Sequence, residues 1–420
     1  MCIYFLFKKK KSTIIKPLSH YLNLFQANRG TVRPSGNFNS SADAEALRKA
    51  MRGLGTDEET ILQLLIARSN AQRQEIKTVY KTLFGKDLVD DLKGELGGKF
   101  ETLIVSLMTP PVAYDVTALR NAIKGAGTDE KVLVEILASR TPQQVRTIIA
   151  AYRQEYDDDL EEDISGDTSG HFKRLLVILL QLTGTLNMCC HVVVLQVLFQ
   201  AGELKFGTEE QTFVTILGNR SPEHLRKVFD AYMKMSGYEM EETIKRETSG
   251  NLRALLLAVV KCARSVPTYF AETLYHSMKG AGTDDDTLIR VMVTRSEVDL
   301  LDIRAEFRKL FACSLHSMIK GDTGGDLRKA LLLLCGGDDI LFILDQFEPI
   351  FPLFSPNLSY FKLFSSLFLD TFLFLLMHLC RKKVSIHLTH FGLKCLKFLP
   401  ILSRLFNSLI ELILFQIWPI

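Results

Sequence analysis

The stretch Met51-Arg52-Gly53-Leu54-Gly55-Thr56 is the most informative part of the sequence for the fold. Its last four residues form a Gly-Xaa-Gly-Thr motif, and the same or a similar motif recurs three more times. The further copies are Gly125-Ala126-Gly127-Thr128, the variant Lys205-Phe206-Gly207-Thr208, and Gly280-Ala281-Gly282-Thr283. Forty residues after the second glycine of each copy stands an acidic residue, in turn Glu95, Asp167, Glu247 and Asp322. The same spacing in four places indicates four copies of one structural unit, each with a copy of one site.

Each unit combines a tight glycine turn with a distant carboxylate. The turn exposes backbone carbonyl oxygens, and the carboxylate can complete a cage made only of oxygen atoms. Such cages suit the hard cation Ca²⁺. The spacing therefore predicts one calcium site in each unit.

The composition excludes some classes of protein. The chain has 420 residues, which allows several domains or one repeat array, and its hydrophobic content of 47% suffices for a large core. The formal net charge of +3 gives no field that favours nucleic acid. The eight cysteines form no Cys-x-x-Cys motif, and the adjacent Cys189 and Cys190 with His191 are not expected to converge on one ion. Scattered thiols, and an N-terminus without the order of a signal peptide, favour the cytosol.

Apolar residues recur at helical rather than strand spacing within each unit. The pattern predicts five short helices per unit, with the glycine turn between the first and the second. The last helix of each unit is nearly all apolar but too short to cross a bilayer, so we expect neighbouring helices to bury it. The threonine after each turn, which acidic residues follow, is predicted to be the N-cap of the second helix.

An arginine stands twelve residues after each of these threonines, and a serine or threonine follows it directly. The pairs are Arg68-Ser69, Arg140-Thr141, Arg220-Ser221 and Arg295-Ser296. We expect the hydroxyl residue to cap the next helix. The arginine is expected to be structural and to tie helix ends together inside its unit.

This density of motifs resembles the annexin family. The resemblance covers about residues 29–339 and is carried by residues 51–56, Met278-Lys279-Gly280-Ala281-Gly282-Thr283, Gly166-Asp167-Thr168-Ser169-Gly170 and Cys335-Gly336-Gly337-Asp338-Asp339. Longer runs, such as Gln200-Ala201-Gly202-Glu203-Leu204-Lys205, are similar to the short-tailed, anticoagulant type of that family. The resemblance implies an all-α fold, in which four repeats of about five short helices form a slightly curved disc with the turns and acids on its convex face.

The resemblance also implies which atoms hold Ca²⁺, namely backbone carbonyls and one carboxylate per repeat. With repeats at 41–109, 113–181, 198–262 and 267–339, the ligand residues are Met51, Gly53, Gly55 and Glu95; Ile123, Gly125, Gly127 and Asp167; Gly202, Lys205, Gly207 and Glu247; and Met278, Gly280, Gly282 and Asp322. Bound Ca²⁺ would bridge a cytosolic chain to anionic phospholipid such as phosphatidylserine when calcium rises. Lateral self-assembly on the membrane, shielding of lipid from phospholipase or coagulation factors, and an extracellular pool without a signal peptide are further implications.

Three segments depart from the family pattern. Residues 182–197 are uncharged and form a shorter connection than the polar, acidic one of the family, so the sequence does not define the first helix of repeat three. Phe206, at the tip of the third turn, either dips into the headgroup boundary or packs locally. Residues 1–28 and 340–420 have no counterpart in the family.

The tail after residue 340 is rich in Phe, Leu, Ile and Ser, and residues 363–380 contain a single charge, Asp370. That stretch is a borderline candidate for a transmembrane helix. Three interpretations stay open: a membrane anchor, a folded extra domain, and translation through T-rich non-coding sequence. Peptides from the tail in a tissue digest would exclude the third.

Three classes of function compete. A calcium-dependent phospholipid-binding protein without catalytic activity fits the repeats best. An integral membrane or channel-like protein anchored by the tail is the alternative, and extraction with EGTA separates the two because only a peripheral binder is released. We do not expect an enzyme, since the sequence contains no Gly-x-Ser-x-Gly, P-loop or His-Glu-x-x-His motif.

Overall fold

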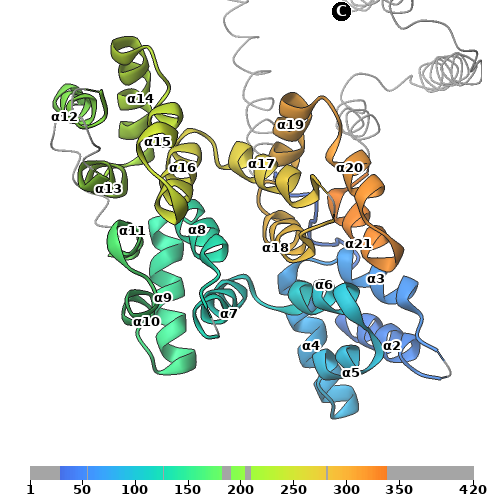
Figure 1. The fold of residues 1–420 in the computed structure, drawn as a ribbon. Coiled ribbons are helices and arrows are strands. Elements are labelled where there is room, and N and C mark those ends of the chain that lie inside the picture. Colours follow the sequence, from blue (N-terminus) through green and yellow to red (C-terminus); the bar gives the residue numbers. More distant parts are fainter. Residues whose placement is uncertain are drawn as a thin grey trace, which may run out of the picture. The chain divides into compact units, whose positions relative to one another are not determined.

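The computed structural model describes residues 29–53, 55–125, 127–181, 191–203, 210–280 and 282–337. Over these residues the chain forms twenty α-helices and no strand, in four consecutive groups of five (Figure 1). Repeat one contains α2 (Ser40–Ala50), α3 (Glu58–Ile66), α4 (Asn70–Phe84), α5 (Leu88–Glu95) and α6 (Gly98–Met108). Repeat two contains α7 (Pro111–Ile123), α8 (Glu130–Ser139), α9 (Pro142–Tyr156), α10 (Leu160–Asp167) and α11 (Gly170–Gln181).

Repeats three and four follow the same order of helices. Repeat three contains α12 (His191–Glu203), α13 (Glu210–Asn219), α14 (Pro222–Ser236), α15 (Met240–Glu247) and α16 (Gly250–Arg264). Repeat four contains α17 (Val266–Met278), α18 (Asp285–Arg295), α19 (Leu300–Phe311), α20 (Leu315–Asp322) and α21 (Gly325–Cys335). The prediction of an all-α fold with four repeats of five helices is confirmed.

Two separate apolar cores hold these helices together. One core combines repeats two and three, and the other combines repeats one and four. The apolar last helices α6, α11, α16 and α21 contribute fully buried leucines to them, namely Leu103, Leu175, Leu255 and Leu331. These helices are therefore buried by their neighbours, as their composition predicted.

The threonines after the first, second and fourth glycine turns are not N-caps, so that prediction was wrong by one residue there, and Thr208 lies outside the described residues. The caps of α3, α8 and α18 are Asp57, Asp129 and Asp284, whose carboxylates accept the backbone N–H groups of Thr60, Val132 and Thr287. The helix begins one residue later than expected because each aspartate has non-helical backbone angles and its own carboxylate caps the helix, while its N–H bonds to the preceding helix. This leaves the threonine hydroxyl available for another contact.

The hydroxyl residues after the repeated arginines cap three of the four third helices. Ser69 and Thr141 form capping boxes at the start of α4 and α9, and Ser221 caps α14. Ser296 does not, because it adopts helical dihedral angles at the end of α18. There the chain continues through a turn, and α19 begins only after Asp299.

Three of the repeated arginines are structural, as expected. Arg68 donates two hydrogen bonds to Asp43 of α2, and Arg140 donates two to Asp115 of α7. Arg295 instead bonds both oxygens of Asp299 at 2.7 and 2.6 Å. These bidentate contacts tie the end of the second helix to the first helix in repeats one and two, and to the start of α19 in repeat four.

Repeat three differs at the arginine. Leu195 of α12 stands twenty-five residues before Arg220, the place that Asp43 and Asp115 take before Arg68 and Arg140. Within the described part of the chain, Arg220 Nε is buried and has no hydrogen-bond partner. Helix α12 nevertheless forms, and it begins at His191, inside the segment that the sequence left undefined.

Candidate calcium sites

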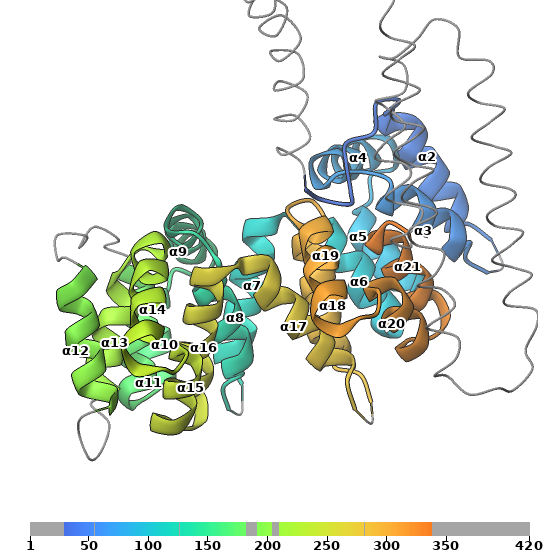
Figure 2. The same ribbon diagram turned by 90° about the horizontal axis from the view of Figure 1, so that it is seen from above.

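The same backbone hydrogen bond closes the base of the glycine turn in three repeats. The N–H donors are Asp57, Asp129 and Asp284, and the carbonyl acceptors are Ala50 at 2.9 Å, Ala122 at 2.8 Å and Ser277 at 2.8 Å, on the first helix of each repeat. Figure 2 shows the turns after α7 and α17 on the same side of the ribbon. The turn is therefore held by the pairing of two helices.

Buried side chains anchor the start of each of these turns. Met51, Ile123 and Met278 are only 7%, 6% and 3% exposed, whereas the glycines after them are exposed. Gly282 adopts φ +111°, where a side chain would be strained although no atom lies within 4 Å of its place. Backbone conformation thus favours glycine at the second position of each described turn, since Gly55 and Gly127 also have positive φ. The buried side chain before each turn fixes the position of the carbonyls.

Each acidic residue is the last residue of the short fourth helix of its repeat. Glu95, Asp167, Glu247 and Asp322 end α5, α10, α15 and α20, which all have eight residues. The threonine that follows three of these helices bonds back to the carbonyl four residues earlier. Because the helices are equal in length and end alike, the acids lie at equivalent positions in all four repeats.

A threonine hydroxyl connects turn and acid in three repeats. Thr56 Oγ1 donates to Glu95 Oε2 at 2.7 Å, and Thr283 Oγ1 donates to Asp322 Oδ2 at 2.6 Å. Thr128 Oγ1 makes the same bond to Asp167 Oδ2. The structure therefore brings together the turn and the carboxylate that spacing had linked in repeats one, two and four.

In repeat three the structure describes only part of the predicted ligand set. Gly202 is buried near the end of α12, where an added Cβ would lie 3.0 Å from Tyr232 Oη and from Thr243 Cγ2. Glu247 ends α15. Lys205, Gly207 and the tip residue Phe206 lie outside the described residues, so the third site stays a prediction.

Open hollows lie beside two of the carboxylates. A hollow of about 380 Å³ is lined by Glu58, Glu95, Lys99 and Asp326, among others. A second, of about 340 Å³, has Glu130, Asp167, His171 and Asn251 in its lining. The two sets stand in matching places of repeats one and four and of repeats two and three. Both carboxylates are thus reachable from solvent beside their turns.

Within the described residues, no group of three or more His, Cys, Asp or Glu side chains is placed to hold a metal ion. The candidate sites are of another kind, with one carboxylate and several carbonyl oxygens each. Cys189 and Cys190 lie outside the described residues. Near the first turn, hydrogen bonds from the backbone and the side chain of Thr60 lower the pKa of Asp57, so this cap stays ionised in mildly acidic solution.

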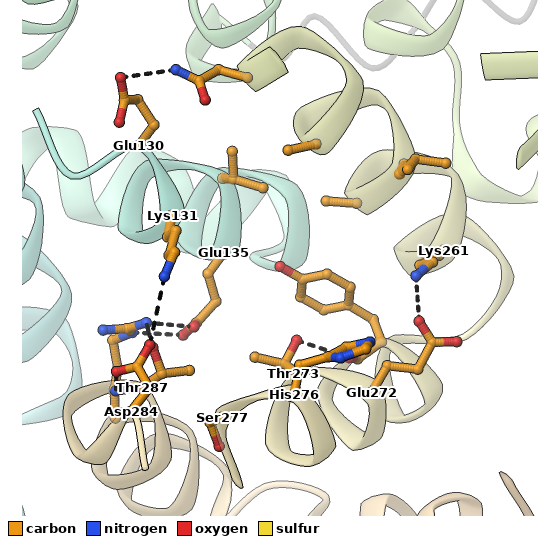
Figure 3. Close-up of a pocket in the computed structure, with 17 residues that line it drawn as sticks. Glu130, Lys131, Glu135, Lys261, Glu272, Thr273, His276, Ser277, Asp284 and Thr287 are labelled. Atoms are coloured by element: carbon orange, nitrogen blue, oxygen red, sulfur yellow. Dashed lines mark hydrogen bonds and ion pairs between the residues drawn. The ribbon is translucent and has the colours of Figure 1, made fainter. Parts of the chain in front are cut away.

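A further cleft lies at the seam between the two cores, beside the base of the fourth turn, because Ser277 and Asp284 are in its lining. It encloses about 530 Å³ between α8, α16, α17 and α18 (Figure 3). At its floor Arg290 Nε and Nη2 bond both oxygens of Glu135 at 3.0 and 2.9 Å, and both residues are buried. Sequence reasoning missed this pair. Its signal was a single charge inside each of two apolar helical runs, residues 132–137 and 288–293.

Comparison with known proteins identifies the family and the fold. The family model described as Annexin matches residues 42–107, 114–179, 196–259 and 269–334. Annexin A5 of Gallus gallus is 68% identical over 315 residues, which are 74% of this chain and 98% of that protein. Annexin A5 of Homo sapiens is 64% identical over 318 residues, 75% of this chain and 99% of that protein. The crystal structure of chicken annexin V superposes with a TM-score of 0.71 at 67% identity, covering 74% of this chain and all of that one.

Proposed function

Because this chain belongs to the annexin family, whose members bind phospholipid in a calcium-dependent way, we propose that it binds anionic membranes such as those containing phosphatidylserine. Binding is peripheral and reversible, and Ca²⁺ forms the bridge. The observation that carries the proposal is the meeting of a glycine turn with a carboxylate, built in the same way in three repeats.

The proposed ligands are the predicted ones. Carbonyl oxygens of Met51, Gly53 and Gly55 face Ca²⁺ together with the carboxylate of Glu95 in repeat one. The corresponding residues serve in repeats two and four, and Gly202, Lys205, Gly207 and Glu247 serve in repeat three. Support comes from the buried anchors below each described turn and from the shared position of the four acids at helix ends.

The charge of this ligand set explains why lipid takes part. One carboxylate and three neutral carbonyls neither neutralise Ca²⁺ nor fill its six to eight coordination positions. Lipid phosphate fills the remaining positions, so affinity for the ion alone is weak and rises when lipid is present. The coupling is reciprocal, since calcium raises lipid affinity by the same factor. Several weak sites on one protein then act as a multivalent anchor.

Basic residues beside the turns add attraction. Arg52, Lys124 and Lys279 each follow an anchor residue directly and are exposed. An anionic leaflet attracts each such charge within a Debye length of its surface.

The proposed mechanism also sets where the chain acts. The chain resides in the cytosol and moves to membranes when calcium rises. There it covers anionic lipid, which shields the lipid from phospholipases or coagulation factors, and neighbouring copies assemble laterally.

The alternative of an integral membrane protein rested on the C-terminal tail. Among the residues that the structure describes, no helix is long and apolar enough to cross a membrane. The candidate stretch 363–380 lies outside them.

Co-sedimentation of the full chain with phosphatidylserine vesicles tests the proposal. We expect pelleting in Ca²⁺, release in EGTA, and no pelleting with phosphatidylcholine vesicles. The combined variant Glu95→Gln, Asp167→Asn and Asp322→Asn should lose most of the binding. A matched control, Glu75→Gln with Glu155→Gln and Asp230→Asn, removes the same charge from exposed positions on α4, α9 and α14 and should bind normally. Pelleting that persists in EGTA, or equal binding by both variants, would contradict the proposal.

A further inference from the structure

The threonine of each described turn makes a contact that neither helix capping nor packing requires. Its hydroxyl donates to a carboxylate thirty-nine residues away in repeats one, two and four. In repeats two and four the hydroxyl also lies 3.3 Å from the main-chain oxygen of the same aspartate, Asp167 or Asp322. The contact therefore recurs in three copies with the same polarity.

Local structure does not account for it. The N-caps of α3, α8 and α18 are the aspartates that follow the threonines. The threonines are half-buried, while Glu95 and Asp167 are exposed. A neutral hydroxyl that bonds an exposed carboxylate contributes little to folding, because water competes for the same acceptor. Stability alone thus gives no reason for the bond at Glu95 and Asp167, and the same bond recurs at Asp322, which is half-buried.

We propose that Thr56, Thr128 and Thr283 are positioning residues for the carboxylates that bind Ca²⁺. This inference rests on the proposed function of those carboxylates. An exposed side chain at a helix end samples several rotamers, and an ion that binds both of its oxygens must first order it. The hydroxyl holds the carboxylate at the turn before the ion arrives, so less order has to be created on binding.

The hydroxyl and the ion do not exclude each other. A carboxylate offers about four lone-pair sites on its two oxygens, and the threonine occupies one of them. The remaining sites suffice for bidentate contact with Ca²⁺. The opposite possibility is that the hydroxyl competes with the ion for the carboxylate. The two differ in sign, because removal of a positioning group weakens calcium binding and removal of a competitor strengthens it.

Valine tests the role, since it keeps the shape of threonine and lacks the hydroxyl. The test variant of the full chain carries Thr56→Val, Thr128→Val and Thr283→Val, and the rescue variant carries serine at the same three positions. Thr60→Val is the matched control, because the Thr60 hydroxyl bonds the cap Asp57 in the same turn region, 2.7 Å away. Ca²⁺ binding is measured by calorimetry without lipid and by half-maximal pelleting with phosphatidylserine vesicles. Thermal unfolding in EGTA monitors the fold.

We expect the valine variant to need about tenfold more Ca²⁺ in both assays, the usual effect of losing an outer-shell partner of a metal ligand. The serine variant and Thr60→Val should match the unmodified chain, and unfolding in EGTA should be alike in all. Unchanged or tighter Ca²⁺ binding by the valine variant, or an equal loss in Thr60→Val, overturns the inference. If the unmodified chain binds Ca²⁺ in calorimetry but pellets with no vesicles, the proposed function fails while calorimetry still decides the role of the threonines. If it binds no Ca²⁺, both are overturned.

Discussion

Replacing Glu135 by glutamine should destabilise the protein more than any exposed charge change. Glu135 lies on α8 in the core of repeats two and three, and its partner Arg290 lies on α18 of repeat four. Their exposed fractions are 2% and 7%. Burial lowers the pKa of Arg290, but the charge of Glu135 and its hydrogen bonds together outweigh burial and raise that pKa, so Arg290 is held as a cation in the buried pair.

The magnitude follows from the geometry. At about 3 Å and an effective dielectric constant of about 20, the two charges attract by about 5 kcal/mol. Glutamine keeps the shape but places an N–H₂ group against a guanidinium that only donates, so one of two hydrogen bonds is lost with the charge. Breaking one partner of a buried pair costs about 3–5 kcal/mol, and we expect about 3 kcal/mol here because one hydrogen bond survives.

Urea unfolding followed by far-ultraviolet circular dichroism measures this cost. Asp326→Asn is the matched control, because Asp326 also bonds a cation, Lys329, at 2.9 Å but both side chains are about half exposed. It should cost less than about 1 kcal/mol. The double variant Glu135→Met with Arg290→Met removes both charges and should recover most of the loss. If Glu135→Gln costs no more than Asp326→Asn, the pair does not hold the seam.

Three further predictions concern single positions. Burial and the hydrogen bond to Asp163 raise the pKa of Tyr152 to about 12. The stabilising contribution of neutral Tyr152 is complete below pH 10 and is lost as the pH rises toward 12. Tyrosinate absorbance and the unfolded fraction should therefore rise together in that range, and both should rise less steeply in Tyr152→Phe. Asp115→Leu leaves the buried Arg140 without its partner and should cost about 3–5 kcal/mol in urea unfolding. Leu195→Asp should be near neutral, because about 1.5–3 kcal/mol gained in bonds to Arg220 offsets about 1.5–3 kcal/mol of lost leucine burial. Equal costs for the two variants would contradict this account. Gly282→Ala should lose about 1–2 kcal/mol by backbone strain and weaken Ca²⁺ binding in calorimetry, whereas Gly166→Ala in α10, where φ is not positive and no atom crowds the Cβ, should do neither.

The fold was predictable because repetition multiplies a weak signal. One glycine turn or one apolar run is ambiguous, but four copies in register fix the number, order and burial of the helices. The pairing of turn and acid was predictable for the same reason. In repeats one, two and four a hydrogen bond joins the threonine of the turn to the acidic residue.

The features that could not be predicted from the sequence depend on contacts outside the repeating pattern. Threonine and aspartate are both good N-caps, so local propensity does not choose between them; at Asp57, Asp129 and Asp284 the N–H of the aspartate also bonds to the preceding helix. Ser296 follows its arginine directly, as Ser69 does, but in repeat four Arg295 bonds Asp299 across a turn and Ser296 does not cap the next helix. The buried pair of Glu135 and Arg290 joins residues 155 positions apart, so no periodicity of the sequence predicts their contact.

The way these sites are built also explains which turn residues are free to vary. The base of each described turn is closed by backbone atoms, and buried side chains at the end of the first helix fix its position. The proposed ligands in the turn are carbonyl oxygens, which every residue type possesses, so the residue between the two glycine positions needs no particular side chain. That position holds Leu54, Ala126, Phe206 and Ala281 in the four copies. On the proposed mechanism, calcium binding constrains the second glycine, the threonine and the distant acid, which all four copies share, and it sets no requirement on the side chain at the tip.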